Sequence, residues 1–441
     1  MATLKTLNPA TQEVLAELEI TSDQTIKEMV QRSKIAQKTW GAKTVEERAS
    51  FIIKAYEEIK KDKNQMAELI HSEMGKTLKE AMGEVEGYVG GIQEMALEVA
   101  EALKPVSKTV GNVTTTTYYD PLGVCASITP WNFPLGMPHT LMMPSLMAGN
   151  TVIFKPSEEV PLIGIKYAEI LNKFLPTDVL QIVIGTGEQG KKLVEAKDVQ
   201  LITFTGSQAT GKHILEHAGK DLKRVLLELG GKDPLIVLED ADLDAAAQFA
   251  VTNSFRNAGQ VCVSTEQIYV MENQEKEFIS KLKKYAQNVE IGAMINQKQK
   301  NHVLRQIKEA LNDGAQLEMG NPEQANLAPI ILSKLKPNMN IMIDETFGPV
   351  ACVMAVKNAD EAIELANQSH YALGGVIFSK DIEKAKRLGR QLKAAMVGIN
   401  KGVSGVKGSP WVGAGQSGYG FHGSAEGHRQ FTQLRILSEV H

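Results

Sequence analysis

The chain has 441 residues, a length that suits two or three domains, and 43% of them are apolar, which is ample for buried cores. Its 48 basic and 52 acidic residues leave a net charge of −4, so the composition excludes a polyanion-binding protein and favours small-molecule partners over nucleic acid. The first residues lack the apolar core of a secretory signal, and the least polar later stretch, 135–154, contains prolines, a histidine and an asparagine. We therefore expect a cytoplasmic protein with no membrane partner.

Helices are predicted for the first hundred residues, followed by an extended segment. The helical face near residue 55 carries five residues at helical spacing, which are Phe51, Ile52, Ala55, Tyr56 and Ile59. Gly75 is predicted to end a later helix. Residues 114–119 are rich in β-branched and aromatic side chains and are closed by Pro121, which predicts an extended arm rather than a core strand.

From residue 123 the pattern alternates between short apolar runs and helical segments. The runs are 124–128, 151–154, 180–184, 201–204 and 225–229, and 162–174 is one of the helical segments between them. This is repeated βαβ, which predicts a parallel sheet with helices on both faces. A second α/β region follows Gly230-Gly231, so we place a domain boundary near residue 231. Its predicted elements are helix 243–255, strand 267–271, helices 276–286 and 297–312, and strands 350–356 and 375–378.

Polar residues follow four of the predicted strands of the first region. The segments are Thr129-Pro-Trp-Asn-Phe-Pro134, Lys155-Pro-Ser-Glu158, Thr205-Gly-Ser207 and Glu228-Leu-Gly-Gly231. In open α/β sheets, ligands bind beyond the carboxyl ends of the strands. A sheet that only packs would not need charged and polar groups at four such positions, so these segments are the first candidates for a functional site.

Two glycine-rich turns are candidates for binding a pyrophosphate. Gly185-Thr-Gly-Glu-Gln-Gly190 matches the G-x-G-x-x-G pattern after a strand, but the acidic residue expected about 20 positions later is missing. The match is as consistent with a plain turn as with a dinucleotide fingerprint. Gly206 and Gly211, which bracket the start of the next predicted helix, are equally suited to letting a pyrophosphate approach backbone N–H groups.

The three cysteines are Cys125, Cys262 and Cys352. They lie far apart with no C-x-x-C pair, which argues against a disulfide framework and a cysteine zinc site, and no metal is expected. Cys262 lies in the glycine-containing segment 257–264 rather than in an apolar run. A lone cysteine is more often a small buried hydrophobe than a nucleophile. The other candidate residues are therefore needed to distinguish a nucleophilic Cys262 from a structural one.

A thiolate nucleophile needs a group that stabilises the oxyanion it creates and, for hydrolysis, a base that activates water. Asn132 offers an amide donor and Glu228 a carboxylate, each at a strand exit. Each also has a structural alternative, since Asn132 can cap a helix, Glu228 can form an ion pair at a strand end, and Lys155 can be a solvated surface charge. Their joint occurrence favours catalysis.

Residues 345–349, Glu-Thr-Phe-Gly-Pro, precede a predicted strand and can be only a turn. Glu345 can also accept a hydrogen bond from a ribose hydroxyl, and Phe347 can flank a planar ring. The segment is therefore either a turn or part of a cofactor-binding site.

Six of these segments together resemble the aldehyde dehydrogenase superfamily. They are Pro130-Trp-Asn-Phe-Pro134, Lys155-Pro-Ser-Glu158, Phe204-Thr-Gly-Ser207, Leu227-Glu-Leu-Gly-Gly231, Gly259-Gln-Val-Cys262 and Glu345-Thr-Phe-Gly-Pro349. Their order and spacing match the family over nearly the whole chain, and Asn8-Pro-Ala-Thr11 and Gln416-Ser-Gly-Tyr-Gly420 are also similar to it.

The resemblance implies an α/β fold with two Rossmann-like parallel-sheet domains and a β oligomerisation arm. The expected NAD(P)-binding domain comprises residues 1–110 and 122–231, and the catalytic domain comprises 232–415. Residues 111–121 and 426–441 are expected to form the arm, which assembles homodimers or homotetramers.

In that family, the matching residues oxidise an aldehyde to a carboxylic acid through a thioester. Cys262 would attack the aldehyde, and the Asn132 amide with the Cys262 backbone N–H would hold the oxyanion. Glu228 would then activate the water that hydrolyses the thioester, which favours acid formation over transfer to coenzyme A. A coenzyme A-acylating enzyme and a catalytically silent structural homologue remain the alternatives.

The resemblance also implies the residues that bind the cofactor. Lys155 and Glu158 would hold the adenosine ribose, Gly206 and Ser207 the pyrophosphate, and Glu345 the nicotinamide ribose. The further cofactor contacts implied are Trp131, Ser157, Gly211, Leu229 and Phe347. A carboxylate at position 158 accepts ribose hydroxyls and repels a 2′-phosphate, so NAD is expected, with NADP as a possible second cofactor.

Arg256, six residues before Cys262, is similar to an arginine of succinate semialdehyde dehydrogenases that holds the distal carboxylate of the substrate. The second arginine of that clamp is absent, with Thr140 near its place, and Arg256 can instead simply order the loop. Segments 287–327, which is short for the family, and 410–415, which replaces the usual glycine pair and lysine, depart from the pattern. Neither departure is expected to touch the chemistry.

Overall fold

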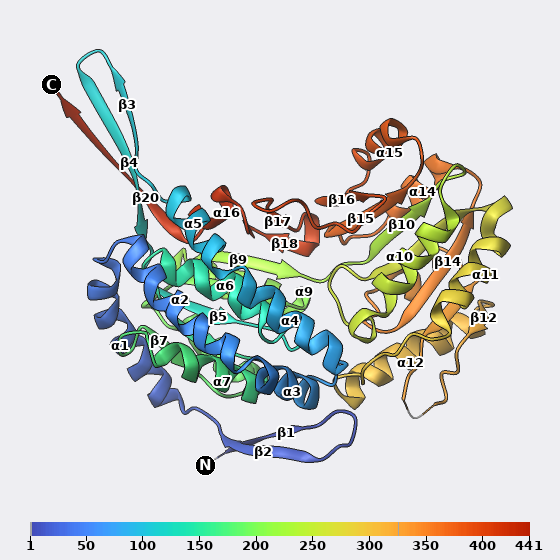
Figure 1. The fold of residues 1–441 in the computed structure, drawn as a ribbon, viewed down its shortest axis with the longest axis horizontal. Coiled ribbons are helices and arrows are strands. Elements are labelled where there is room, and N and C mark those ends of the chain that lie inside the picture. The colour runs from blue at the N-terminus through green and yellow to red at the C-terminus, as the bar shows by residue number, and fades with distance from the viewer. Residues whose placement is uncertain (1, 325) are drawn as a thin grey trace.

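The first five apolar runs form the parallel strands of one sheet in the computed structural model, which describes residues 2–324 and 326–441 (Figure 1). These strands are β5 (Val124–Ile128), β6 (Thr151–Lys155), β7 (Leu180–Ile182), β8 (Val199–Gly206) and β9 (Arg224–Leu229). Their spatial order is β9-β8-β5-β6-β7, and β18 (Gly418–Tyr419) adds an antiparallel edge beside β9. Numbered 1 to 5 in chain order and read from β7, the strands follow the order 3-2-1-4-5, as in the Rossmann fold. The predicted strands and the predicted fold class are confirmed.

Nine helices cover this sheet. They are α1 (Asp23–Gly41), α2 (Val45–Lys61), α3 (Lys63–Met74), α4 (Leu78–Gly90), α5 (Ile92–Ala102), α6 (Gly136–Met147), α7 (Pro161–Asn172), α8 (Gly187–Glu195) and α9 (Gln208–Ala218). Of the predicted stripe of α2, Ile52, Ala55, Tyr56 and Ile59 are buried and Phe51 is half-buried. Gly75 follows the last residue of α3 and has a positive φ of 87°, which favours glycine.

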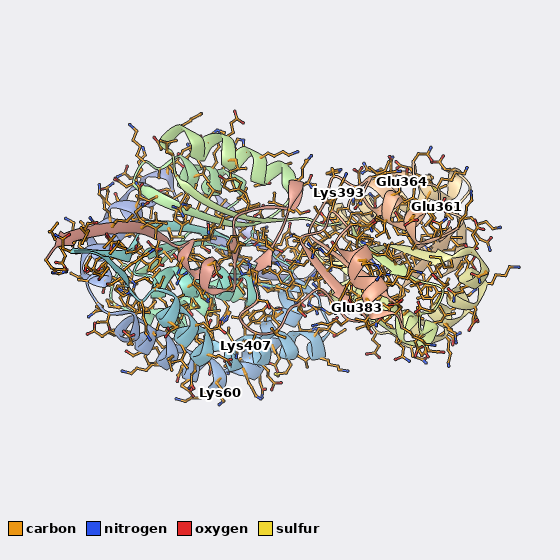
Figure 2. The ribbon with its side chains drawn as sticks, turned by 90° about the horizontal axis from the view of Figure 1, so that it is seen from above. Lys60, Glu361, Glu364, Glu383, Lys393 and Lys407 are labelled. Atoms are coloured by element: carbon orange, nitrogen blue, oxygen red, sulfur yellow. The ribbon has the colours of Figure 1, made fainter. Side chains whose placement is uncertain are left out.

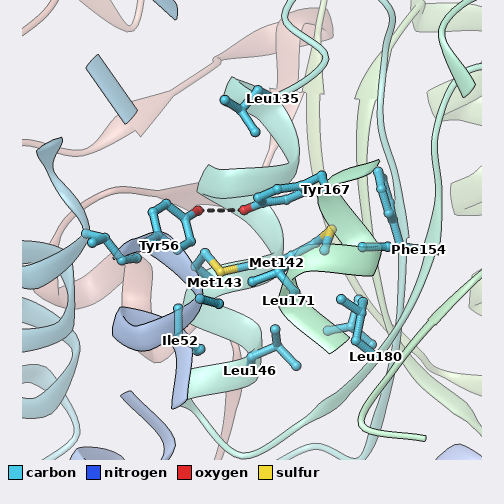
Figure 3. Close-up of a cluster of buried hydrophobic side chains, with 14 of the residues drawn as sticks. Ile52, Tyr56, Leu135, Met142, Met143, Leu146, Phe154, Tyr167, Leu171 and Leu180 are labelled. Carbon is cyan, nitrogen blue, oxygen red and sulfur yellow. Dashed lines mark hydrogen bonds between the residues drawn. The ribbon is translucent and has the colours of Figure 1, made fainter. Parts of the chain in front are cut away.

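The strands are buried on both faces, so their side chains alternate between two cores. On one face, residues of α2, α3, α6 and α7 pack against Cys125, Val152 and Phe154. Figure 3 shows this core, where the hydroxyls of Tyr56 and Tyr167 are hydrogen-bonded at 2.5 Å. On the other face, α1, α8 and α9 pack against residues such as Ile153. The predicted coverage of both faces is therefore confirmed.

The prediction of helices alone for the first hundred residues is wrong at the N-terminus, where β1 (Thr3–Leu7) and β2 (Val14–Glu19) form an antiparallel hairpin. Its turn is held by Asn8, whose Oδ1 accepts the N–H groups of Ala10 and Thr11. Asn-Pro is a turn signal, and the two strands are too short and too mixed in polarity to show clear alternation.

The second lobe contains a seven-stranded sheet in the order β12-β13-β14-β11-β10-β15-β16, in which only β12 is antiparallel. Its strands are β10 (Asp233–Val237), β11 (Thr265–Met271), β12 (Gln316–Met319), β13 (Ile330–Ser333), β14 (Val350–Val356), β15 (Gly374–Phe378) and β16 (Met396–Ile399). Its helices are α10 (Leu243–Phe255), α11 (Glu275–Ala286), α12 (Gln297–Asn312), α13 (Asn340–Ile343), α14 (Ala359–Ala366) and α15 (Ile382–Gly389). All six elements predicted for this region are present.

A three-stranded sheet projects from the first lobe (Figure 1). It is built from β3 (Val106–Val110), β4 (Val113–Pro121) and β20 (Thr432–Val440), with β4 in the centre. β20 pairs with β4 along its whole length, from Thr432 opposite Pro121 to Val440 opposite Val113. The sheet thus includes β3, which the sequence placed before the arm.

The C-terminal part also contains β17 (Trp411–Val412), β19 (Phe421–His422) and α16 (Ala425–Arg429). Charged residues of both signs lie on the outside of the molecule, and Figure 2 shows Lys60, Glu364 and Glu383 among them. Within the described residues, no helix is long and apolar enough to cross a membrane.

Candidate active site

The candidate site lies at the point where the order of the first sheet reverses. β5 and β8 are neighbours, but the helices that follow them, α6 and α9, pack on opposite faces of the sheet. This leaves an opening beyond the strand ends. A cavity of about 500 Å³ occupies it. It is lined from the first lobe by residues that include Trp131, Asn132 and Ser207, and from the second by residues that include Cys262 and Glu345.

Cys262 lines this cavity and is partly exposed, whereas Cys125 and Cys352 are buried. The loop before it is unusual, because Asn257, Ala258 and Gly259 all have left-handed backbone angles, with φ of 53°, 55° and 71°. A non-glycine residue in this region costs about 1–2 kcal/mol. The backbone N–H of Asn257 donates to the Glu80 carboxylate at 2.6 Å, a bond that ties the loop to α4.

Asn132 is buried and its side-chain Nδ2 donates to the carbonyl oxygen of Gln260 at 3.1 Å. The amide has a second N–H, which this bond leaves available. The Asn132 carbonyl oxygen accepts from Lys76 Nζ at 2.9 Å and from Asn257 Nδ2 at 3.1 Å. Both the backbone and the side chain of Asn132 are therefore held from several directions.

A buried ion pair supports this arrangement. Lys76 lies 2.6 Å from Glu84, and both side chains are 1% exposed. The other oxygen of Glu84 accepts the N–H groups of Leu135 and Gly136, at the start of α6, at 2.9 Å each. The sequence reasoning missed these residues. A signal exists, since Glu84 and Tyr88 follow Ala81 at helical spacing, where apolar residues are expected.

Glu228 is the second-to-last residue of β9 and is only 5% exposed. Its Oε1 accepts the indole N–H of Trp411 at 3.1 Å, and its Oε2 has no hydrogen-bond partner among the described residues. Burial raises the pKa of Glu228, while Cys262, Trp411 and Thr205 each act to lower it. Burial and the neighbouring Glu228 carboxylate raise the pKa of Cys262 well above its usual value. The thiol and the carboxyl group are thus electrostatically coupled.

The expectation that segment 410–415 does not touch the chemistry is wrong, because Trp411 contacts Glu228 directly. The two residues are 183 positions apart in the sequence, and no local pattern links them.

Six of the ten predicted cofactor-binding residues line the cavity, which are Trp131, Gly206, Ser207, Leu229, Glu345 and Phe347. The rings of Trp131 and Phe347 meet edge to face, with centroids 5.4 Å apart. Glu345 accepts the N–H of Gly231 at 3.0 Å. Burial and the nearby Glu266 raise the pKa of Glu345 to about 8.

The loop that carries Glu345 and Phe347 is fixed by a buried ion pair between Lys232 and Glu266 at 2.6 Å. Glu266 also accepts the N–H groups of Thr346 and Phe347, at 2.7 and 2.8 Å. Sequence reasoning did not identify Lys232 or Glu266. The pair holds the loop in place, and neither residue lines the cavity.

The other four predicted cofactor residues do not line the cavity, which are Lys155, Ser157, Glu158 and Gly211. Lys155 is buried at the end of β6 and its Nζ donates to Glu158 at 3.3 Å, and burial lowers its pKa. A side chain at position 211 would collide with Leu229, so glycine lets α9 approach β9. At the competing motif, Thr186 and Gln189 form a capping box that already occupies N–H groups at the start of α8.

Arg256 is exposed, and its guanidinium lies 5.1 Å from the centre of the Phe133 ring. It lines a second cavity of about 280 Å³ together with Tyr88 and Asn257. Tyr88 interacts electrostatically with Cys262, Glu228 and Arg256, so Arg256 lies near the candidate catalytic residues without lining their cavity. The hydroxyl of Thr140 donates to a carbonyl oxygen of its own helix.

A thiol, an amide donor and a buried carboxyl group meet at the opening between two Rossmann-like lobes, beside a pocket suited to a nucleotide. Such a set of groups is suited to an enzyme that uses a cysteine nucleophile, and the Rossmann-like lobes are typical of nucleotide-dependent dehydrogenases. The chain belongs to the aldehyde dehydrogenase family, which residues 2–437 match. It is an NAD(P)-dependent oxidoreductase that oxidises aldehydes.

Curated relatives cover nearly the whole chain. It is 34% identical to a betaine aldehyde dehydrogenase of Bacillus subtilis over 417 residues, 90% of this chain and 85% of the relative. It is 32% identical to a succinate-semialdehyde dehydrogenase [NADP(+)] of Deinococcus radiodurans over 458 residues, 98% of this chain and 94% of the relative. Among solved structures, the NADP-dependent glyceraldehyde-3-phosphate dehydrogenase of Bacillus halodurans C-125, complexed with NADP, superposes with a TM-score of 0.96. That structure is 32% identical, and the match covers 100% of this chain and 96% of the other.

Proposed function

We propose that this enzyme oxidises an aldehyde that carries a carboxylate at its far end, such as succinate semialdehyde, to the corresponding acid. The observation that carries the proposal is the free positive charge of Arg256. None of the described carboxylates lies within ion-pair distance of its guanidinium, whereas the neighbouring Lys76 is neutralised by Glu84. An unpaired guanidinium beside a small cavity suits a carboxylate, which it can bind with two hydrogen bonds.

In the proposed reaction, the Cys262 sulfur attacks the aldehyde carbon, and the Asn132 amide with the Cys262 backbone N–H binds the resulting oxyanion. The nicotinamide, when bound, supplies the hydride acceptor. Glu228 then takes a proton from a water molecule whose oxygen attacks the thioester carbon. The C–S bond breaks, the acid leaves, and the proton passes from Glu228 to the sulfur, which restores the thiol and the carboxylate. Support comes from Oε2 of Glu228, which has no hydrogen-bond partner among the described residues, and from the electrostatic interaction of the Glu228 carboxylate with Cys262, which raises the pKa of the thiol.

Replacing Arg256 with Gln tests the substrate. We expect kcat/KM for succinate semialdehyde to fall about tenfold, because the residue is exposed and its bond to the substrate is partly screened, while uncharged aldehydes keep their values. Arg387→Gln, an exposed arginine on α15, is the matched control. Steady-state kinetics with both substrate classes measure the effect. Equal losses for charged and neutral aldehydes would contradict the proposal.

A cationic aldehyde is the second candidate, as the name of the Bacillus subtilis relative suggests. The aromatic side chains of Tyr88 and Phe133 in the second cavity favour it. The positive charge of Arg256 in the same cavity opposes it. A higher kcat/KM for betaine aldehyde than for succinate semialdehyde would select this candidate.

For the cofactor, we propose a preference for NAD over NADP. Glu158 lies 3.3 Å from Lys155, and its side chain is 40% exposed, so it can reach a ligand beyond the end of β6. In Glu158→Gln, kcat/KM with NADP should rise about fivefold relative to NAD, because a charge that repels the 2′-phosphate is removed. Glu159→Gln, whose carboxylate is bonded instead to Asn296, is the control. An unchanged ratio would count against this role.

For assembly, we propose that the sheet of β3, β4 and β20 joins copies of the chain into dimers or tetramers. Exposed apolar residues along it support this, including Val106, Ile436, Leu437 and Val440. Both edge strands are also open to pairing. The molecular mass in solution distinguishes two subunits from four.

A further inference from the structure

Two strand pairings anchor the segment that carries Trp411. Trp411 faces His422 in the ladder of β17 and β19. Between them, β18 pairs with β9 in a register that places Gly418 directly opposite Glu228. The hydroxyl of Ser417 donates to the carbonyl oxygen of Gly230 at 2.7 Å, two residues beyond Glu228. The segment that carries Trp411 is therefore fixed to the strand that carries the proposed base.

The contact itself is specific for one oxygen of the carboxyl group. The Trp411 indole N–H donates to Oε1 at 3.1 Å, and Oε2 has no partner among the described residues. An indole nitrogen only donates, so it can neither take the catalytic proton nor turn into an acceptor. This bond therefore leaves Oε2 as the oxygen that is free to react.

We propose that Trp411 is a positioning residue, which anchors Oε1 of Glu228 so that Oε2 is presented to the hydrolytic water. The proposal rests on the general-base role proposed for Glu228. It assigns a function in deacylation to a residue in a segment that departs from the family pattern.

The same bond affects the charge of the base. Burial raises the pKa of Glu228, and an N–H that donates to the carboxylate opposes that increase. The titratable groups that interact with Glu228 are Cys262 and Tyr88, and burial raises the pKa of both. His422, opposite Trp411, has its pKa lowered to about 4 by burial and is neutral near pH 7. Glu345 lines the same cavity, interacts with Cys262 and has its pKa raised to about 8. Trp411 is bonded to Glu228 and not to Glu345, so the limb of the pH profile that moves in a Trp411 variant is the one that belongs to Glu228.

Trp411→Phe tests the proposal, because it keeps the ring and removes only the N–H. A carboxylate that loses a donor is protonated up to a higher pH, so the acid limb of the kcat profile should move up by about one pH unit. At pH values below the shifted limb, kcat of the variant should be about tenfold lower than that of the wild type, and at high pH it should return to the wild-type value. The burst of NADH in the first turnover, which reports acylation, keeps its amplitude and rate.

Trp40→Phe is the matched control, because it also removes a buried indole N–H bond, to the carbonyl oxygen of Leu146, but far from the cavity. It should leave the pH profile in place. If Trp411→Phe gives the wild-type pH profile while Glu228→Gln stops turnover, the positioning role of Trp411 is wrong, but the general-base role of Glu228 is kept. If Glu228→Gln leaves turnover intact, the proposed base itself is wrong. A loss of burst and kcat together at every pH would instead give Trp411 a role in substrate binding and overturn the proposal.

Discussion

Replacing Glu228 with Gln is expected to stop the enzyme after a single burst of NADH. The amide cannot take a proton from water, so the thioester on Cys262 is formed but not hydrolysed. Because a positioned general base contributes about 10²–10⁴ to rate, kcat should fall by about that factor while the first turnover remains. The amide oxygen can still accept the Trp411 N–H, so the fold around it is kept.

Two measurements check this outcome. Rapid mixing records the burst of NADH, and intact-protein mass spectrometry detects the acyl group left on Cys262. Glu73→Gln is the matched control, because Glu73 is another buried carboxyl group, whose pKa burial raises to about 7, bonded to the start of α7 and remote from the cavity. The hydrolytic assignment fails if Glu228→Gln turns over at the wild-type rate. Turnover that appears only with coenzyme A in wild-type enzyme would identify the acylating alternative.

Much of the fold follows from patterns that are local in the sequence. The parallel strands are buried on both faces, so each is a short apolar run, and the glycines and polar residues that end these runs mark the strand exits. Helix 243–255 and strand 350–356 coincide with α10 and β14 to the residue. β10 was missed because it begins only two residues after Gly231 and is five residues long.

Only part of the candidate site could be predicted from local sequence patterns. Asn132, Glu228 and Cys262 stand at strand ends or in a glycine-containing loop, where the architecture itself indicates a ligand. The supporting residues carry no such signal. Lys76 is a charged residue after a glycine, and its burial depends on Glu84 and on the Asn132 carbonyl, which are brought to it by separate elements. Long-range contacts of this kind depend on the complete fold.

Removing the side-chain amide of Asn132 should slow the first chemical step by about 10²–10³, the usual cost of one oxyanion donor. Asn132→Ala deletes the donor, and Asn132→Asp keeps the size but adds a negative charge beside the developing oxyanion. We therefore expect the aspartate variant to be slower than the alanine variant. The alanine variant loses the bond to the Gln260 carbonyl, which costs about 0.5–1.5 kcal/mol of stability. The aspartate variant costs more, because it places a buried carboxylate against that carbonyl oxygen, so thermal unfolding of both variants is measured first.

The rate of NADH formation in a single turnover measures this effect, and the affinity for the cofactor is measured separately by quenching of protein fluorescence. A structural role alone would loosen the Cys262 loop in both variants to a similar degree, so they would lose rate equally. If Asn132 is an oxyanion donor, the burst rate should be highest in the wild type, lower in the alanine variant and lowest in the aspartate variant. Burst rates equal to wild type in both variants would exclude Asn132 from the reaction. The order of the two variants separates the roles because the Asn132 backbone carbonyl can stay bonded to Lys76 and Asn257 in either case, while the group that faces the substrate is absent in one variant and negatively charged in the other.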